Sequence, residues 1–172
     1  MVLATLKGMA SRPSGVVGLV LIGFHVVLAI VSPVIVPYDF KEMSVQSTLK
    51  APSVEHWFGT DILGRDVLTR TMLGGQQALF VTSIAAVIAV TWGGLLGVLL
   101  GLVGGLIDDL LMRVVDAFLA IPWILFLLLI IAMVGTGVAV LIPTLGFFYG
   151  IPVIRIVRAA THDVVARDFV TA

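Results

Sequence analysis

Three long stretches of this chain lack aspartate, glutamate, lysine and arginine. They cover residues 13–38, 71–107 and 117–154, which are 26, 37 and 38 residues long. Soluble domains carry charge at about a quarter of their positions, whereas this chain of 172 residues is 12% charged and 60% hydrophobic. Because the hydrocarbon of a lipid bilayer excludes charge, the pattern predicts an all-α integral membrane protein.

The lengths of these stretches predict four transmembrane helices. A hydrocarbon core about 30 Å thick is crossed by about 20 helical residues. The first stretch supplies one helix over residues 15–37, which is too long in apolar sequence for a cleaved secretory signal. The second favours one tilted helix near residues 78–103 over a short hairpin. The third is too long for one crossing and is expected to fold back at Gly135-Thr136-Gly137, which gives helices near residues 115–134 and 138–157.

The basic residues between these helices predict the orientation. Lys and Arg concentrate in the cytoplasmic connections of membrane proteins. If residues 1–14 are cytoplasmic, residues 38–77 form an external loop, and six of the ten basic residues lie inside. The inner group is Lys7, Arg12, Arg113, Arg155, Arg158 and Arg167, and the outer group is Lys41, Lys50, Arg65 and Arg70. We therefore expect a multi-pass protein with a cytoplasmic N-terminus.

Composition removes several classes of function. Ten acidic and ten basic residues leave no net charge to attract nucleic acid. Cysteine is absent, which excludes disulfides, thiolate metal sites and thiol catalysis. His56, Asp61 and Asp66 lack a recognised spacing of metal ligands, and His25 is interpreted as a neutral histidine facing a helix neighbour. We expect no catalytic residue, no metal and no cofactor in this chain.

Small residues recur at every fourth position along the second predicted helix. They are Ala85, Ala89, Gly93, Gly97, Gly101 and Gly105. Residues four apart lie above one another on a helix, so these positions form one stripe. Helices in lipid associate mainly through close van der Waals contact, which such a stripe permits. Two interpretations stay open: packing within one subunit, or a subunit interface or moving translocation face.

Prolines fall inside the third and fourth predicted helices, at Pro122, Pro143 and Pro152. Each proline frees a backbone carbonyl and is a plausible bend. Broken helices line pathways in transporters, but ordinary kinks are commoner. These prolines are candidate pathway kinks.

The polar loop before the second helix carries a turn residue and paired charges. Gly59 offers a turn, and Thr60 or Asp61 is suited to cap a helix that follows. Asp61 with Arg65, and Asp66 with Arg70, have the i,i+4 spacing of helical ion pairs. The loop is therefore predicted to contain a short helix. Asp109 with Arg113, and Arg113 with Asp116, are predicted ion pairs of the next connection.

Three blocks of sequence resemble one family. Residues 56–70, HWFGTDILGRDVLTR, resemble the H-P-L-G-T-D-x-x-G-R-D-V-L-S-R signature of peptide and nickel ABC importer permeases of the dipeptide/oligopeptide permease C type, with Trp57 in place of proline. Residues 104–116 with Ala120-Ile121-Pro122 resemble the family's G-G-x-x-D-x-x-L-M-R-x-x-D block. Residues 155–158 with 168–172 are similar to the opening of its cytoplasmic EAA loop.

The resemblance implies a six-helix permease subunit of a bacterial or archaeal plasma membrane, with residues 78–172 as part of its type-1 transmembrane domain. Its partners are a second permease subunit, cytoplasmic ATPase subunits and an external solute-binding protein that delivers peptides. Because residue 172 falls at the start of the EAA loop, the last two helices are expected to be missing, as in a fragment or truncated product. The alternative is a secondary transporter or channel segment, although intramembrane acids typical of one are absent.

The resemblance also assigns residues. The signature loop comprises Gly59, Thr60, Asp61, Gly64, Arg65 and Asp66. ATPase coupling falls to the start of the EAA loop, at Arg167, Asp168, Phe169, Val170, Thr171 and Ala172. The chain has no G-x-x-x-x-G-K-[ST] motif, so ATP hydrolysis is expected on a partner subunit.

Overall fold

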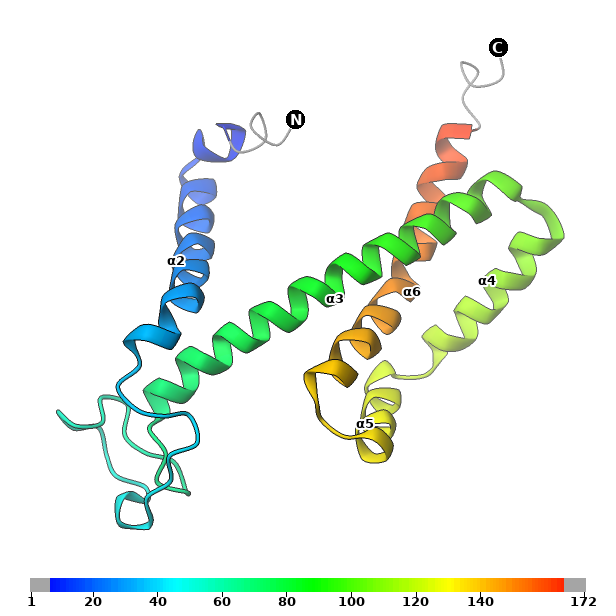
Figure 1. Ribbon diagram of the computed structural model, residues 1–172. Coiled ribbons are helices and arrows are strands. Elements are labelled where there is room, and N and C mark those ends of the chain that lie inside the picture. The colour runs from blue at the N-terminus through cyan, green and yellow to red at the C-terminus, as the bar shows by residue number, and fades with distance from the viewer. Residues whose placement is uncertain (1–6, 166–172) are drawn as a thin grey trace. The chain divides into compact units, whose positions relative to one another are not determined.

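The computed structural model describes residues 7–165, and within that range the regular structure is helical. The elements are α2 (Pro13–Ile35), the 3₁₀ turn η1 (Val45–Ser47), α3 (Val67–Val103), α4 (Gly105–Ala120), α5 (Trp123–Val134) and α6 (Val138–Val165), as shown in Figure 1. The only β-type pairing among the described residues is an isolated bridge between Thr60 and Asp66. The expected all-α class is confirmed.

Three helices are long and apolar enough to cross a membrane, namely α2, α3 and α6. The pair formed by α4 and α5 passes the same test together but bends by 77°. The described part of the chain thus holds three candidate spans, or four if the bent pair crosses as one. The side chains of α2 are exposed or half-buried except for Ser32.

The third predicted helix, near residues 115–134, is two helices. The break falls at Ile121 and Pro122. Ile121 is extended, with φ −98° and ψ 130°, because the ring of a following proline excludes the helical conformation from the residue before it. The mid-run glycines also act as expected, since Gly135 has φ 110° and separates α5 from α6.

Two helices are longer than their sequence signals suggested. α3 begins at Val67 instead of near residue 78, since Gly74 and Gly75 are accommodated inside the helix. α6 extends to Val165 instead of 157 and contains both Pro143 and Pro152. α3 ends at Val103 as expected, because Gly104 and Gly105 take positive φ values of 60° and 64° that turn the chain into α4.

The chain divides into two compact units, which meet in sequence within α3, between Phe80 and Val81. In the first, the buried side chains include the polar residues Thr60, Asp66 and Thr69. In the second, an apolar core joins α3, α4 and α6 through Leu100, Val115, Phe148, Ile151 and Ile154. Aromatic rings extend this core, with Trp92 stacked on Phe147 at a centroid distance of 5.2 Å.

Candidate functional site

Two glycines shape the loop that resembles the family signature. Gly59 and Gly64 both have φ of 71°, a left-handed conformation that other residues adopt only at a cost. Each also lies against backbone: a Cβ at Gly59 would meet the carbonyl oxygen of Lys50, and one at Gly64 would meet that of Ser44. Glycine is required at both positions by conformation and by space.

Thr60 and Asp61 tie this loop to itself. The Thr60 hydroxyl accepts a hydrogen bond from the Lys50 N–H at 2.9 Å and donates to the carbonyl of Ser47. Asp61 accepts from the backbone N–H groups of Leu63 and Arg65 at 2.8 and 3.1 Å, and from the Arg65 side chain at 2.8 Å. The Gly64 N–H donates to the Asp61 carbonyl at 3.0 Å, which closes the four-residue turn from Asp61 to Gly64.

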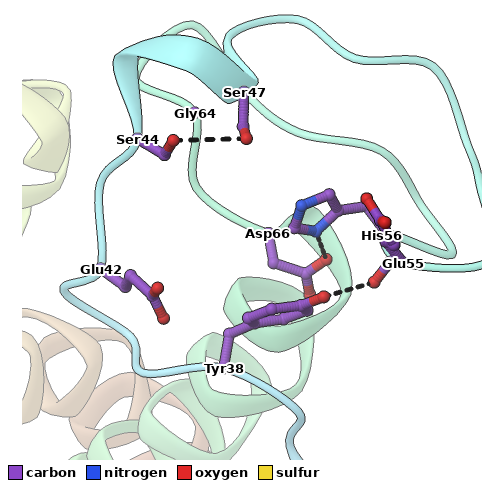
Figure 2. Close-up of a pocket in the computed structure, with 8 residues that line it drawn as sticks. All are labelled: Tyr38, Glu42, Ser44, Ser47, Glu55, His56, Gly64 and Asp66. Carbon is purple, nitrogen blue, oxygen red and sulfur yellow. Dashed lines mark hydrogen bonds and ion pairs between the residues drawn. The ribbon is translucent and has the colours of Figure 1, made fainter.

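Asp66 connects the loop to α3. Its Oδ2 accepts the backbone N–H of Thr69 at 2.7 Å, which satisfies one free donor at the start of α3. Its Oδ1 lies 3.0 Å from His56 Nδ1, with the Asp66 side chain 1% exposed. The Tyr38 ring packs on His56 at 4.8 Å, and its hydroxyl donates to the Glu55 carbonyl at 2.6 Å. These groups line a polar cavity of about 280 Å³, drawn in Figure 2.

Both aspartates are held ionised. Burial pushes the pKa of the Asp66 carboxyl upward, but hydrogen bonds from the Thr69 N–H and from His56 outweigh it, so its pKa lies below the ordinary value of 3.8. Asp61 shows the same balance, since bonds from the backbone of Arg65 and Leu63 and from the Arg65 guanidinium outweigh burial and lower its pKa. The loop therefore depends on charged carboxylates.

The expected short helix after Gly59 is wrong. Residues 60–66 fold back on themselves instead, with the Asp61 N–H donating to the Arg65 carbonyl at 3.0 Å. The reason is that the Asp61 carboxylate satisfies the turn's own N–H groups and so competes with helical bonding. Arg70 reaches Asp61 at 3.8 Å and lies over the Phe40 ring at 4.7 Å, whereas its predicted helical partner Asp66 is bound to His56.

The stripe of small residues on α3 faces α6. Ala85 and Ala89 are 1% and 3% exposed. A Cβ at Gly93 would meet the Gly150 backbone, and one at Gly97 would lie 2.8 Å from the carbonyl oxygen of Ile154. A Cβ at Gly101 would lie 2.6 Å from Thr161 Cβ. Gly105, the last member of the predicted stripe, lies in α4 and has open space around it.

α6 also places glycines of its own against α3. Added Cβ atoms at Gly146 and Gly150 would meet the side chains of Ile88 and Trp92. The Trp92 indole N–H also donates to the Gly146 carbonyl at 2.9 Å. Residues 85–101 of the stripe thus pack within the chain itself, and the two helices approach closely on both sides.

Two of the three candidate prolines lie at one cavity. Pro122 and Pro152 both line an apolar hollow of about 230 Å³, beside Trp123 and Tyr149, whose rings lie 5.4 Å apart. Pro143 is also inside α6 but does not line this hollow. Pro122 breaks the chain between two helices, whereas α6 continues through Pro152.

Ion pairs link α4 to α6. Asp108, 2% exposed, binds Arg158 through both carboxylate oxygens, and His162 Nε2 lies 3.6 Å from the same carboxylate. Asp116 pairs with Arg155 on the surface. The predicted pairing of Arg113 with Asp109 and Asp116 is not what the structure shows, because α6 brings arginines from far along the chain. All four residues of the observed pairs lie in the sequence blocks that resemble the family, residues 104–116 and 155–158.

The remaining predicted residues are outside the described part of the chain. Arg167, Asp168, Phe169, Val170, Thr171 and Ala172, the predicted coupling residues, follow α6 and lie beyond residue 165. Within the residues described, no three His, Asp or Glu side chains gather in a way that could hold a metal ion.

Comparison with known proteins gives two family matches that follow each other along the chain. Residues 6–52 match the N-terminal TM domain of oligopeptide transport permease C. Residues 93–172 match the binding-protein-dependent transport system inner membrane component.

Relatives agree with these matches. The dipeptide transport system permease protein DppC of Bacillus subtilis is 34% identical over 155 residues, which cover 90% of this chain and 48% of the relative. The oligopeptide transport system permease proteins OppC of Bacillus subtilis and Haemophilus influenzae are each 32% identical, over 94% and 92% of this chain and 53% and 52% of their own lengths. The chain spans about half the length of these relatives. It belongs to the family of binding-protein-dependent transport system inner membrane components, in the group that carries the oligopeptide permease C N-terminal segment.

Proposed function

We propose that this chain serves as a permease subunit of an ATP-driven importer that takes up di- or oligopeptides delivered by a solute-binding protein. The observation that carries the proposal is the pair of family matches in sequence order, together with relatives whose names specify dipeptide and oligopeptide transport. A second permease subunit completes the translocation pathway, and ATPase subunits bind the cytoplasmic face.

The described residues support a role in moving solute without chemistry of its own. Apolar helices α3 and α6 pack closely through small residues, so we expect them to move together as one body during transport. The prolines at the 230 Å³ hollow supply bends where helix geometry can change.

Copurification and uptake test the proposal. The chain, expressed with the genes that neighbour it, should bring down an ATPase and a second permease, and the complex in proteoliposomes should accumulate a labelled peptide only with ATP and binding protein. The matched control replaces the P-loop lysine of the partner ATPase. Uptake driven by an ion gradient without ATP would instead establish the secondary-transporter alternative.

The orientation is a separate part of the proposal. We place the N-terminus and the end of α6 in the cytoplasm and the α2–α3 loop outside. The chain has no cysteine, so single cysteines can be introduced without background. Ser53→Cys should react with an impermeant maleimide on whole cells, and Asp163→Cys should react only after permeabilisation. Reaction of both from the same side would contradict this layout.

A further inference from the structure

The last turns of α6 are fastened to the chain differently from its middle. Up to Ile154, α6 contributes Phe148, Ile151 and Ile154 to the apolar core. Beyond that point, exposed and polar positions increase, and the contacts that hold the helix are Val157 against Gly97, Thr161 against Gly101 and the charged groups of α4. Residues 155–165 are therefore held by a few specific contacts and not by the core.

A weak point in α6 precedes these turns. Pro152 has no backbone N–H, so the Phe148 carbonyl has no helical donor four residues on. A helix bends most easily where this ladder is interrupted. Ile154 still joins α6 to the core two residues beyond Pro152, so the segment that can bend away from the core is residues 155–165.

The ion pair of Asp108 with Arg158 holds this terminal segment against α4. Its carboxylate is 2% exposed and binds the Arg158 guanidinium through both oxygens, with Nε on Oδ1 and NH2 on Oδ2. Two-point binding between these planar groups fixes direction as well as distance. His162, one turn further along α6, adds a third nitrogen 3.6 Å from the carboxylate. Asp108 therefore contacts α6 at residues 158 and 162, beyond the proline, and we call this set of contacts the clamp.

The position of Asp108 makes this contact mechanically useful. It lies in the first turn of α4, directly after the glycine turn that ends α3. One carboxylate therefore links the corner between α3 and α4 to the segment of α6 that leads into residues 167–172. We propose that Asp108 is a positioning residue that makes the α3–α4 corner and the end of α6 move as one body, so that force applied after α6 reaches the helices instead of bending residues 155–165 away from the core. This inference rests on the proposed function only in assigning that force to an ATPase partner.

A structural measurement tests the clamp without reference to transport. In the intact membrane protein in detergent, Asp108→Asn should raise amide hydrogen exchange several-fold in residues 155–165 and leave residues 144–151 unchanged. Asp116→Asn is the matched control, because it removes the same charge from the same helix in a pair whose side chains are 53% and 57% exposed. Equal protection of residues 155–165 in Asp108→Asn and the unmodified protein would overturn the clamp.

A double variant shows whether the two groups act as one. Asp108→Asn and Arg158→Gln should each lower the thermal midpoint, and the double variant should be no worse than the poorer single variant. Additive losses would overturn the pairing. If Asp108→Asn does not accumulate in the membrane, Arg158→Lys serves in its place, since it keeps the charge but not the two-point geometry, and it should show the same rise in exchange.

The transport measurement separates this inference from the proposed function. In proteoliposomes of the complete transporter, Asp108→Asn should lose at least tenfold of the ATPase stimulation caused by the binding protein while the unstimulated rate persists, and Asp116→Asn should stay within twofold of the unmodified protein. Stimulation retained in Asp108→Asn would overturn the coupling role. If the unmodified protein shows no ATP dependence but the exchange result holds, the proposed function fails and the clamp stands.

Discussion

The α2–α3 loop and the contact between α3 and α6 both depend on glycine, but they use different properties of it. In the loop, Gly59 and Gly64 adopt positive φ, and the side chains of Thr60, Asp61 and Asp66 accept hydrogen bonds from backbone N–H groups that hold the loop in place. Between the helices, Gly93 and Gly150 have ordinary helical backbones and supply only the absence of a side chain.

This difference follows from the surroundings. A loop in water competes with solvent for every backbone group, so it is specified by bonds that satisfy its donors locally. Helices in lipid already satisfy their backbones, and apolar burial does little to join them, so approach distance decides their association. Substitutions in the loop should therefore act mainly through backbone conformation, and substitutions in the helix contact should act mainly through the volume of the added side chain.

The largest effect is expected where a side chain enters the helix contact. Gly93→Val should destabilise the second unit by about 3 kcal/mol, the upper end of the usual range for overpacking, because its Cβ meets the Gly150 backbone. Gly94→Val is the control, since the neighbouring glycine has nothing within 4 Å. Thermal unfolding in detergent measures both, and equal midpoints would show that the contact is not close in the membrane protein.

A glycine of the loop should respond next most strongly. Gly64→Ala should cost about 1–2 kcal/mol for the left-handed conformation alone, with the contact to the Ser44 carbonyl added to it. Gly74→Ala, a helical glycine in open space, should be neutral or slightly stabilising. Protease cleavage within residues 40–66 reports the loop directly. Unchanged cleavage in Gly64→Ala would show that this turn is not fixed as described.

Acid should loosen the loop and spare the helix contact. Because the pKa values of Asp61 and Asp66 are lowered on folding, their stabilisation is complete above the ordinary value of 3.8 and is lost as pH falls through the lower folded-state values. Fluorescence of Trp57, with Trp92 and Trp123 replaced by phenylalanine, should show this transition. In Asp61→Asn the acid-dependent change should shrink, and a full transition there would remove Asp61 from the explanation.

The smallest effect is expected from one hydrogen bond between helices. Trp92→Phe keeps an aromatic ring at the position that stacks on Phe147 but removes the indole donor to the Gly146 carbonyl. Interhelical hydrogen bonds in membrane proteins contribute about 0.6 kcal/mol on average, so the unfolding midpoint should fall only slightly. A loss as large as that of Gly93→Val would mean that polar contact, and not close approach, holds this pair of helices.

Hydrophobic length and glycine positions predicted much of the helix layout. The ends of α3 at Val103 and of α5 at Val134 follow from glycines that turn the chain, and those signals are local. The break at Pro122 was visible in the sequence as a candidate kink, but the degree of the 77° bend was not. A proline removes one bond and one conformation, whereas the angle depends on what the two helices pack against.

The charged residues show the opposite case. Spacing predicted Asp66 with Arg70 and Asp109 with Arg113, which are neighbours on an isolated helix. The structure pairs Asp66 with His56 and Asp108 with Arg158 instead. The partner of Asp108 comes from another helix, and that of Asp66 lies ten residues earlier in the same loop, so helical spacing predicts neither. Asp61 does pair with Arg65 as the spacing predicted.

Charge exclusion and apolar length by themselves determined that this chain is helical and built for a bilayer, because the cost of placing charge in hydrocarbon acts on each residue independently of its neighbours in space. The order of its motif blocks likewise determined its family. Only the tertiary structure decided that the small-residue stripe faces α6, that residues 60–66 close into a turn and that Asp108 holds Arg158. The helix contact and the Asp108 pair depend on segments far apart along the chain, which only folding brings together. The turn is local, but residue spacing did not decide between helical bonding and the hydrogen bonds that the Asp61 carboxylate accepts.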